Sequence, residues 1–338
     1  MKIGLTRRSV ARASAILVVG ALAACGSVPS PSPVPPSPPE RSADPPGGSP
    51  ELLVLLRTPE HMRLAWLAGN AEVAIRTPDS DGRWVSGSPS RGLVLTVGPA
   101  GRIFIGGPLA AGRDPAWQEI PVARDARQWL GQPLADAVPD PASGMIALVA
   151  ADAAAGFSDG HLVIVDPAGG PSHALILPDR WDGRAPAWLG SGRVAISTRD
   201  LGDATALTIV DPRTGATRRW GAAVAAFAVS GDARTIAWQD GNDRRVLVGP
   251  LEVTLAGASP NVVPPDPAAR LAAQILLGDT GRFLAVAWLD DAGDTRAYSI
   301  YERGASGWAL VRDGPLPGGV SRAVLVSLGP TGVDRIRP

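Results

Sequence analysis

The chain has 338 residues, of which 45% are hydrophobic and 19% charged, enough apolar material for one or two packed domains. Because 32 Lys and Arg balance 32 Asp and Glu, the basic excess of a nucleic-acid-binding protein is absent. With three His and one Cys, the chain has almost no material for metal clusters or disulfides, and 40 Gly with 34 Pro favour turns over long helices. We therefore expect no cofactor, no metal and no nucleic-acid partner.

Residues 1–24 predict a secretory signal peptide. Four basic residues and no acidic one precede or enter an apolar run from Ala13 to Ala24. That run is too short to span a bilayer, which needs about 20 residues, so we expect it to be removed. The Arg7-Arg8 pair partly resembles a twin-arginine export signal, and a plain basic region is the alternative.

The end of this run resembles the lipobox of bacterial lipoproteins. It reads Leu22-Ala23-Ala24-Cys25-Gly26, and Cys25 is the one Cys of the chain. The resemblance implies that the Cys25 thiol carries a diacylglycerol and that cleavage occurs before it. The expected location is extracytoplasmic, at the bacterial cell membrane, with the lipid as the anchor. A coincidental Cys in an ordinary signal peptide is the alternative, and the choice between inner and outer membrane stays open.

Residues 25–50 predict a lipidated Cys followed by a disordered tether. Ten Pro and six Ser occur among residues 26–50, without apolar periodicity. Such a segment cannot bury a core and is typical of a polyproline-like linker.

Residues 51–338 predict short strands that recur at a fixed spacing. A motif of strand, polar turn and strand centres on Ala147, Ala195, Ala237 and Ala285, and further short strands follow most copies. The steps between these Ala residues average about 46 residues, which is typical of a four-stranded β-propeller blade. We expect an all-β propeller of six or seven blades, with a β-sandwich or two smaller β-domains as the alternative. Leu64–Ile75 is interpreted as a further copy of the motif around Trp188, with Trp66 at the place of Trp188.

The two ends of this region are expected to share a sheet. Val324–Ser327 reads as a short strand, after which Leu328-Gly329 restarts the turn motif seen at Leu277-Gly278. Glu51–Arg57 is an apolar run without a neighbouring partner, so it could complete the last blade and close the ring.

The copies resemble TolB-like and WD40-like propellers. The shared features are Pro-x-Trp, a Gly turn, a hydrophobic-Ala strand and an exit turn after Val-Asp, and they cover about residues 130–312. The resemblance implies a fold and little about function. We expect a lipid-anchored cell-envelope propeller that acts as a binding or scaffolding module, as a monomer, for envelope protein partners. The alternative is an extracytoplasmic propeller enzyme, a hydrolase or lyase acting on polysaccharide or peptide.

No residue is predicted to be catalytic, and the ligand-binding residues stay unknown. Ser158 lies in the letters Gly-x-Ser-x-Gly but precedes a strand rather than a helix, unlike a nucleophile elbow. His61, His161 and His173 are scattered singly. The run from Asp290 to Asp294 resembles a calcium loop but lacks the spacing of its oxygen ligands, so a tight turn is expected.

Tryptophans and charges recur at blade positions. Trp66 and Trp188 are expected at similar positions, and Trp238 and Trp288 on one strand face, where they would pack between blades. The loops between second and third strands are rich in Asp, while the opposite turns hold several Arg. We therefore hypothesise one acidic and one basic face, with turn preference and solubility as the alternative.

Overall fold

The computed structural model divides the chain into two units, Met1–Ala43 and Asp44–Pro338. The first unit lies outside the described residues, as do parts of the second. The described residues are 50–57, 62–67, 71–75, 84–88, 93–97, 102–107, 116–122, 138–140, 143–150, 160–170, 172–182, 184, 186–200, 204–221, 223–265, 270–278, 280–316 and 322–330.

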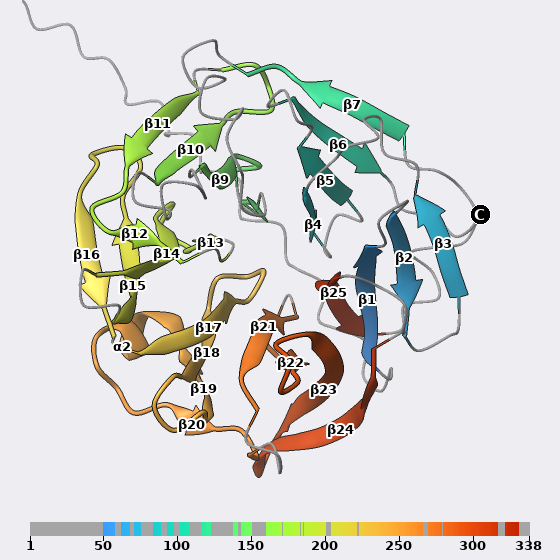
Figure 1. Cartoon of the computed structure of the whole chain (residues 1–338). Helices are drawn as coiled ribbons and strands as arrows, with labels where there is room; N and C mark the ends of the chain where they lie inside the picture. The colour runs from blue at the N-terminus through green and yellow to red at the C-terminus, as the bar shows by residue number, and fades with distance from the viewer. Residues whose placement is uncertain are drawn as a thin grey trace, which may run out of the picture. The chain divides into compact units, whose positions relative to one another are not determined.

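The described strands pair into six antiparallel sheets, which we call blades I to VI (Figure 1). Listed from the innermost strand outward, blade I holds β25 (Arg322–Pro330), β1 (Pro50–Arg57), β2 (Met62–Trp66) and β3 (Ala71–Ile75). Blade II holds β4 (Trp84–Ser88), β5 (Leu93–Val97), β6 (Ile103–Gly107) and β7 (Ala116–Ile120). Blade III holds β8 (Val138–Pro139), β9 (Ile146–Ala150), β10 (His161–Val165) and β11 (His173–Ile176).

Blade IV has two short inner strands, β12 (Arg180–Trp181) and β13 (Ala187–Trp188), then β14 (Val194–Arg199), β15 (Thr205–Val210) and β16 (Thr217–Trp220). Blade V holds β17 (Val224–Val229), β18 (Thr235–Asp240), β19 (Val246–Pro250) and β20 (Asn261–Val262). Blade VI holds β21 (Ala272–Leu277), β22 (Phe283–Leu289), β23 (Thr295–Gly304) and β24 (Gly307–Pro315).

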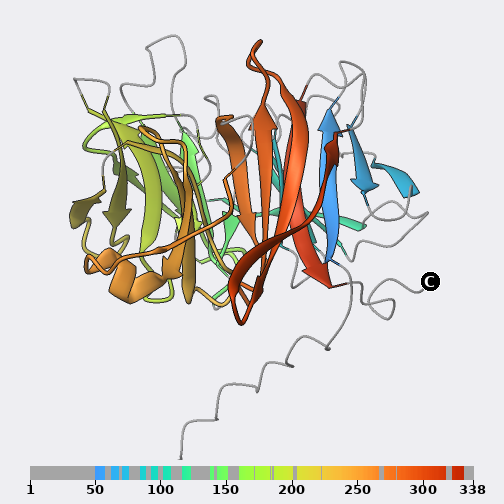
Figure 2. The same cartoon turned by 90° about the horizontal axis from the view of Figure 1, so that it is seen from below.

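The blades form a closed ring. Strands of neighbouring blades contact each other in the order I to VI, and β21 and β22 of blade VI contact β25 of blade I. Figure 1 shows the strands of each blade following one another outward from the axis of the ring, and Figure 2 shows that the strands themselves run roughly along that axis. This arrangement is a β-propeller, so the predicted fold class is confirmed.

The core lies between the blades rather than within one layer. Five clusters of buried apolar side chains occupy the junctions II/III, III/IV, IV/V, V/VI and VI/I. Both faces of a middle strand are therefore covered, and β10 and β14 are buried along almost their whole length. This burial explains why these strands are continuous apolar runs in the sequence rather than alternating ones.

The repeated Ala lies at the same place in four blades. Ala147, Ala195, Ala237 and Ala285 are each on a second strand, are 0–1% exposed, and face the following blade. A methyl group suits this place because neighbouring blades converge toward the axis of the ring.

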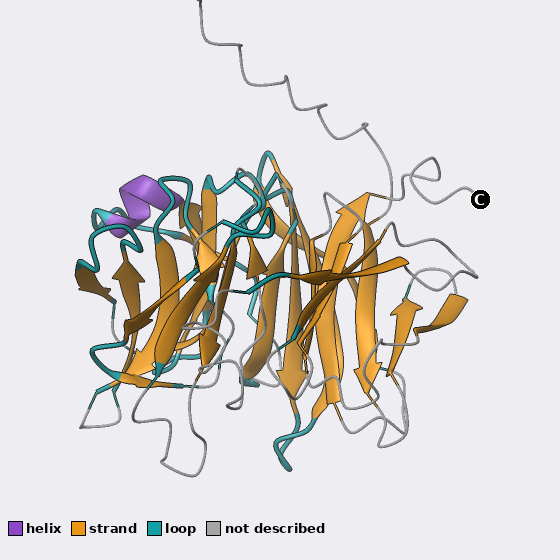
Figure 3. Ribbon diagram, turned by 90° about the horizontal axis from the view of Figure 1, so that it is seen from above, coloured by secondary structure: helices purple, strands orange, loops and turns teal. Residues whose placement is uncertain are grey.

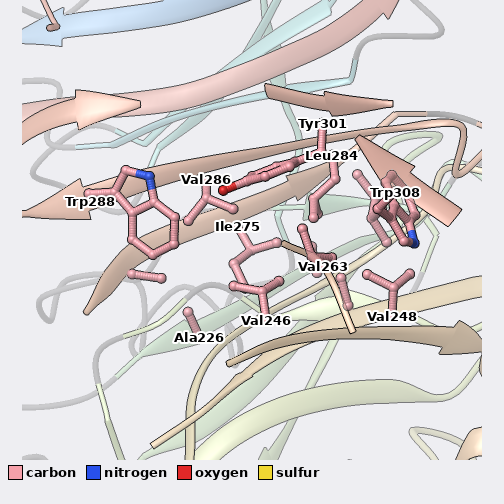
Figure 4. Packing of buried hydrophobic residues seen from close by; sticks show 14 residues of the cluster. Ala226, Val246, Val248, Val263, Ile275, Leu284, Val286, Trp288, Tyr301 and Trp308 are labelled. Atoms are coloured by element: carbon pink, nitrogen blue, oxygen red, sulfur yellow. The ribbon is translucent and has the colours of Figure 1, made fainter. Parts of the chain in front are cut away.

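The tryptophans of the middle blades pack between blades, as predicted for Trp238 and Trp288. Trp288 is 1% exposed and packs between blades V and VI, where Figure 4 shows it near Ile275 and Val286. Its indole N–H donates to the Ser299 hydroxyl at 2.9 Å. Trp238 packs between blades IV and V, edge-to-face with Trp220.

Blade I joins the two ends of the domain. Eight residues of β1, from Pro50 to Arg57, pair antiparallel with β25, and the register shifts once, between Leu53 and Val54. The expected closure of the ring is therefore present. The strand at the C-terminal end is longer than predicted, because Leu328–Pro330 continue it instead of lying in a turn.

The interpretation of Leu64–Ile75 assigns its two strands to the wrong positions within the blade. Because β1 is the second strand of blade I, β2 and β3 are its third and fourth strands. Trp66 therefore ends a third strand, whereas Trp188 lies on a first strand. A hairpin of two apolar strands has the same sequence pattern at either place, so periodicity could not separate them.

Helix is rare in the described part of the chain. The five-residue helix α2 (Leu251–Leu255) follows β19 (Figure 3). Leu251 and Leu255 pack into the junction of blades IV and V. Among the described residues, no helix is long and apolar enough to cross a membrane.

Candidate functional site

The loops of the propeller emerge on two opposite faces. We call the face with the loops between second and third strands the 2–3 face; it also carries the connections from one blade to the next. The 1–2 face carries the loops between first and second and between third and fourth strands, with helix α2 among them. Pro50 pairs with Pro330, so β1 begins and β25 ends at the same place, on the 1–2 face.

Asp residues on the 2–3 face are paired with Arg residues of the same face. Asp243 accepts two bonds from Arg245, one from its guanidinium at 2.5 Å, and these bonds hold the pKa of Asp243 below its usual value. Arg219 lies 2.9 Å from Asp200. Arg296 pairs with both Asp290 and Asp294. The acidic loops are therefore locally neutralised, although exposed pairs of this kind contribute little to stability.

The 1–2 face is also mixed in charge. Arg193 lies 3.1 Å from Glu252 of α2, and Arg282 lies 2.6 Å from Glu302. Asp211 accepts the backbone N–H of Arg213, which is the main reason that the pKa of Asp211 is lowered. The hypothesis of one acidic and one basic face is therefore wrong for the described loops.

The innermost strand of blade IV is interrupted opposite the middle of β14. Trp181 pairs with Thr198 and Ala187 with Ala195, so the pairing partner moves by three positions along β14 while the residue number on the inner side moves by six. Such an extra segment in a strand is a bulge, a feature over-represented beside functional sites.

A buried carboxylate fixes this bulge. The Asp182 side chain is 0% exposed and accepts bonds from the Ser197 hydroxyl at 2.5 Å, the Arg184 backbone N–H at 3.1 Å and the Arg184 guanidinium. The Trp181 indole N–H donates to the Arg184 carbonyl at 2.8 Å. Because a buried charge must be paired, Asp182 holds Arg184 in place.

A buried amide joins blades V and VI in the same region. Gln239 is 0% exposed; its NH₂ group donates to the carbonyls of Arg244 and Arg270, and its oxygen accepts the Ala272 backbone N–H at 2.7 Å. Two of these three partners, Arg270 and Ala272, lie where the chain enters the innermost strand β21, and Arg244 lies in the loop between β18 and β19. Arg270 itself lies over the Trp288 ring, 5.5 Å from its centroid.

Replacing Gln239 with Leu is expected to loosen this junction. The change keeps the shape approximately but leaves the Ala272 N–H and two carbonyls without their partner, at a cost of about 1–3 kcal/mol. Urea unfolding of Gln239→Leu should show this loss, whereas Gln118→Leu, on the exposed face of β7, should change the midpoint little. Equal midpoints for Gln239→Leu and the wild type would contradict this role.

The residues that the sequence singled out are not brought together. Cys25, His61 and Ser158 lie outside the described residues. His161 begins β10 and is 6% exposed. Asp290 forms the predicted tight turn, in which its carboxylate accepts the N–H groups of Ala292 and Asp294. Within the described ranges no group of three or more His, Cys, Asp or Glu could hold a metal ion.

Sequence reasoning missed Asp182, Arg184 and Gln239. The pair Trp181-Asp182 occurs once in the chain and does not recur at blade spacing, and this departure from the repeat is the signal that the sequence offers. The innermost strands with described side chains are β12, β13, β17 and β21. They carry no carboxylate, and their residues are apolar apart from Arg180 and Gln274.

Comparison with solved structures agrees with the fold. The chain is similar to TolB from Acinetobacter baumannii, with a TM-score of 0.55 and 13% identity over 82% of this chain and 65% of that one. The match thus spans just under two thirds of TolB. It is also similar to a protein from Lactobacillus plantarum, with a TM-score of 0.48 and 14% identity, covering 82% of this chain and 100% of that one. A third similar structure is the β-propeller domain of Cps50 (Swd1) from Myceliophteria thermophila, with a TM-score of 0.46 and 15% identity, covering 80% and 84%.

No family model matches the sequence, and no curated protein matches it. At these identities the similarity to TolB shows the fold alone.

Proposed function

We propose that this protein is a lipid-anchored β-propeller of the bacterial cell envelope that binds a protein partner through its 2–3 face. The observation that carries the proposal is the position of blade I, where Pro50 and Pro330 lie together on the 1–2 face. The segment that precedes the domain therefore joins it on that face, which leaves the 2–3 face open for a partner. The similarity to TolB supports a propeller architecture for such a module.

The chemistry of the described residues agrees with binding. A protein interface needs fixed polar groups around an apolar centre, and the 2–3 face offers ion pairs at its loops and apolar innermost strands. We propose residues 1–24 as the signal peptide, residues 25–50 as the lipidated tether and residues 51–338 as the binding domain. The module is proposed to act as a monomer.

Cross-linking from the two faces tests the binding proposal. A photoreactive amino acid is placed in living cells at Asn242 or Ala292, both exposed in turns of the 2–3 face, or at Ser259, exposed on the 1–2 face. A discrete protein adduct from Asn242 and Ala292, but not from Ser259, is the expected result. Adducts from Ser259 alone, or from none of the three, would overturn the proposal.

Replacing Cys25 with Ser is expected to release the protein from the membrane fraction. The thiol is the proposed acceptor of the diacylglycerol, and a hydroxyl is not expected to replace it. The wild type should partition with detergent, with an intact mass that fits a lipidated chain beginning at Cys25. Ser27→Ala, two residues away, should behave as the wild type. Membrane recovery of Cys25→Ser equal to that of Ser27→Ala would refute the anchor.

A further inference from the structure

The bulge in blade IV has the properties of a recognition element rather than of a simple turn. It lies on the inner edge of the blade, because β12 and β13 both pair with the axial side of β14, opposite β15. Its charged residue, Arg184, keeps 28% of its side chain exposed although the carboxylate that it contacts is fully buried. An Arg held in this way loses little conformational freedom when it binds a ligand.

The guanidinium of Arg184 has N–H donors that Asp182 does not use. One terminal nitrogen contacts Asp182, and within the described part of the chain the guanidinium makes no other hydrogen bond or ion pair. Arg carries five N–H donors in a planar fork that matches a carboxylate. Asp182 therefore neutralises part of the charge and orients the fork, while the remaining donors stay open to solvent.

A second Arg precedes the innermost strand of another blade. Arg270 immediately precedes the innermost strand of blade VI, where Gln239 fixes its carbonyl and the Trp288 ring lies beneath its guanidinium. Between these two blades, the described residues that lead into β17 of blade V are Gly221 and Ala223, which carry no charge. The charged residues that the structure describes in or just before the innermost strands of blades IV and VI are Asp179, Arg180, the buried Asp182, Arg184 and Arg270.

We infer that Arg184, together with Arg270, forms a site for the carboxylates of an acidic, extended segment of a protein partner that approaches along the axis of the ring. This inference rests on the proposed function and specifies the chemistry of its partner. The outer loops of the 2–3 face supply few alternatives for an acidic ligand, because Arg219, Arg245 and Arg296 already pair with Asp residues.

The test uses the mature, full-length protein and a fluorescent octaglutamate peptide, with octalysine as the control of opposite charge. Anisotropy should show binding of octaglutamate but not octalysine, weakening as the salt concentration rises toward about 1 M. Arg184→Gln should reduce the affinity about tenfold, as expected for the loss of a charge-assisted hydrogen bond. Arg270→Gln should reduce it as well, whereas Arg245→Gln, which removes an equal charge from an outer loop, should not.

Arg184→Gln leaves Asp182 buried without its cation and could unfold the protein. The double variant Asp182→Asn with Arg184→Gln removes both charges and serves as the folded comparison. It should also bind octaglutamate about tenfold more weakly than the wild type, since the recognising fork is gone. Arg184→Lys keeps the charge but not the fork, and an intermediate affinity is expected.

Two outcomes would overturn the inference. One is the absence of octaglutamate binding by the wild type, and the other is an equal loss of affinity in Arg245→Gln and in the double variant. If octaglutamate fails to bind while Asn242 and Ala292 still cross-link a protein, the binding function stands and the acidic-segment inference fails. If the cross-links are also absent, both fail.

Discussion

A chain that ends at residue 321, and so lacks β25, is expected to lose cooperative folding. The deletion removes the innermost strand of blade I and exposes the edge of β1, on which eight residues are paired. It also removes the strand that β21 and β22 of blade VI contact. The free energy of unfolding of a domain is only about 5–15 kcal/mol, and the loss of the innermost strand of a blade should consume most of it. Circular dichroism during heating and urea unfolding measure the effect.

Truncation after Pro330, which keeps β25, is the matched control and should unfold like the wild type. Val54→Asp gives a second, milder test, because Val54 is 0% exposed and packs against blade VI. An unpaired charge there should destabilise the domain by several kcal/mol. A chain ending at residue 321 with an unchanged unfolding midpoint would show that the ring does not depend on its C-terminal strand.

Trp288→Ala is expected to be the most destabilising substitution of a single side chain among the described blades. Trp288 is 1% exposed, fills the junction of blades V and VI, and donates its N–H to Ser299. Truncating a buried Trp costs about 3–5 kcal/mol, because the transfer energy is lost and a cavity remains. Denaturant unfolding of purified protein should show a lower midpoint.

Two further variants compare the effect of Trp288→Ala with that of truncating an exposed side chain and with that of removing the indole N–H. Leu310→Ala on the outer strand β24, where the side chain is 50% exposed, should change the free energy of unfolding by less than about 0.5 kcal/mol. Trp288→Phe keeps much of the apolar area but leaves the Ser299 hydroxyl without the indole N–H as its donor. Its loss of unfolding free energy should therefore fall between the losses of Trp288→Ala and Leu310→Ala. A Trp288→Ala midpoint no lower than that of Leu310→Ala would refute the inter-blade role of this side chain.

The repeat was the part of the fold that could be predicted from sequence. Ala147, Ala195, Ala237 and Ala285 recur because each occupies the same crowded place on a second strand. The apolar run of β1 had no neighbouring partner, and its pairing with the other end of the domain followed from the need to cover an edge. The phase of Leu64–Ile75 could not be predicted, because a hairpin looks alike in any position of a blade.

The charged surface was predicted less well. Reading the Asp residues of the 2–3 loops as an acidic face ignored Arg245 and Arg296, which follow on the same loops, and Arg219, which reaches Asp200 from β16. The bulge at Asp182 depends on Ser197, a residue 15 positions away in the chain. No local pattern encodes that contact, so this part of the candidate site needed the three-dimensional arrangement.

Closure of the ring by the two ends of the domain is the geometric premise of the proposed binding face, and a disulfide tests it most directly. Leu55 lies opposite Val324 in the β1–β25 register, and directly opposed residues of antiparallel strands fall within the range that a disulfide spans. In a Cys25→Ser background, Leu55→Cys with Val324→Cys should cross-link on mild oxidation and raise the unfolding midpoint. Leu55→Cys with Leu328→Cys, whose positions are offset along the strands, should not cross-link. Cross-linking of the offset pair, or none by the opposed pair in folded protein, would contradict the closure.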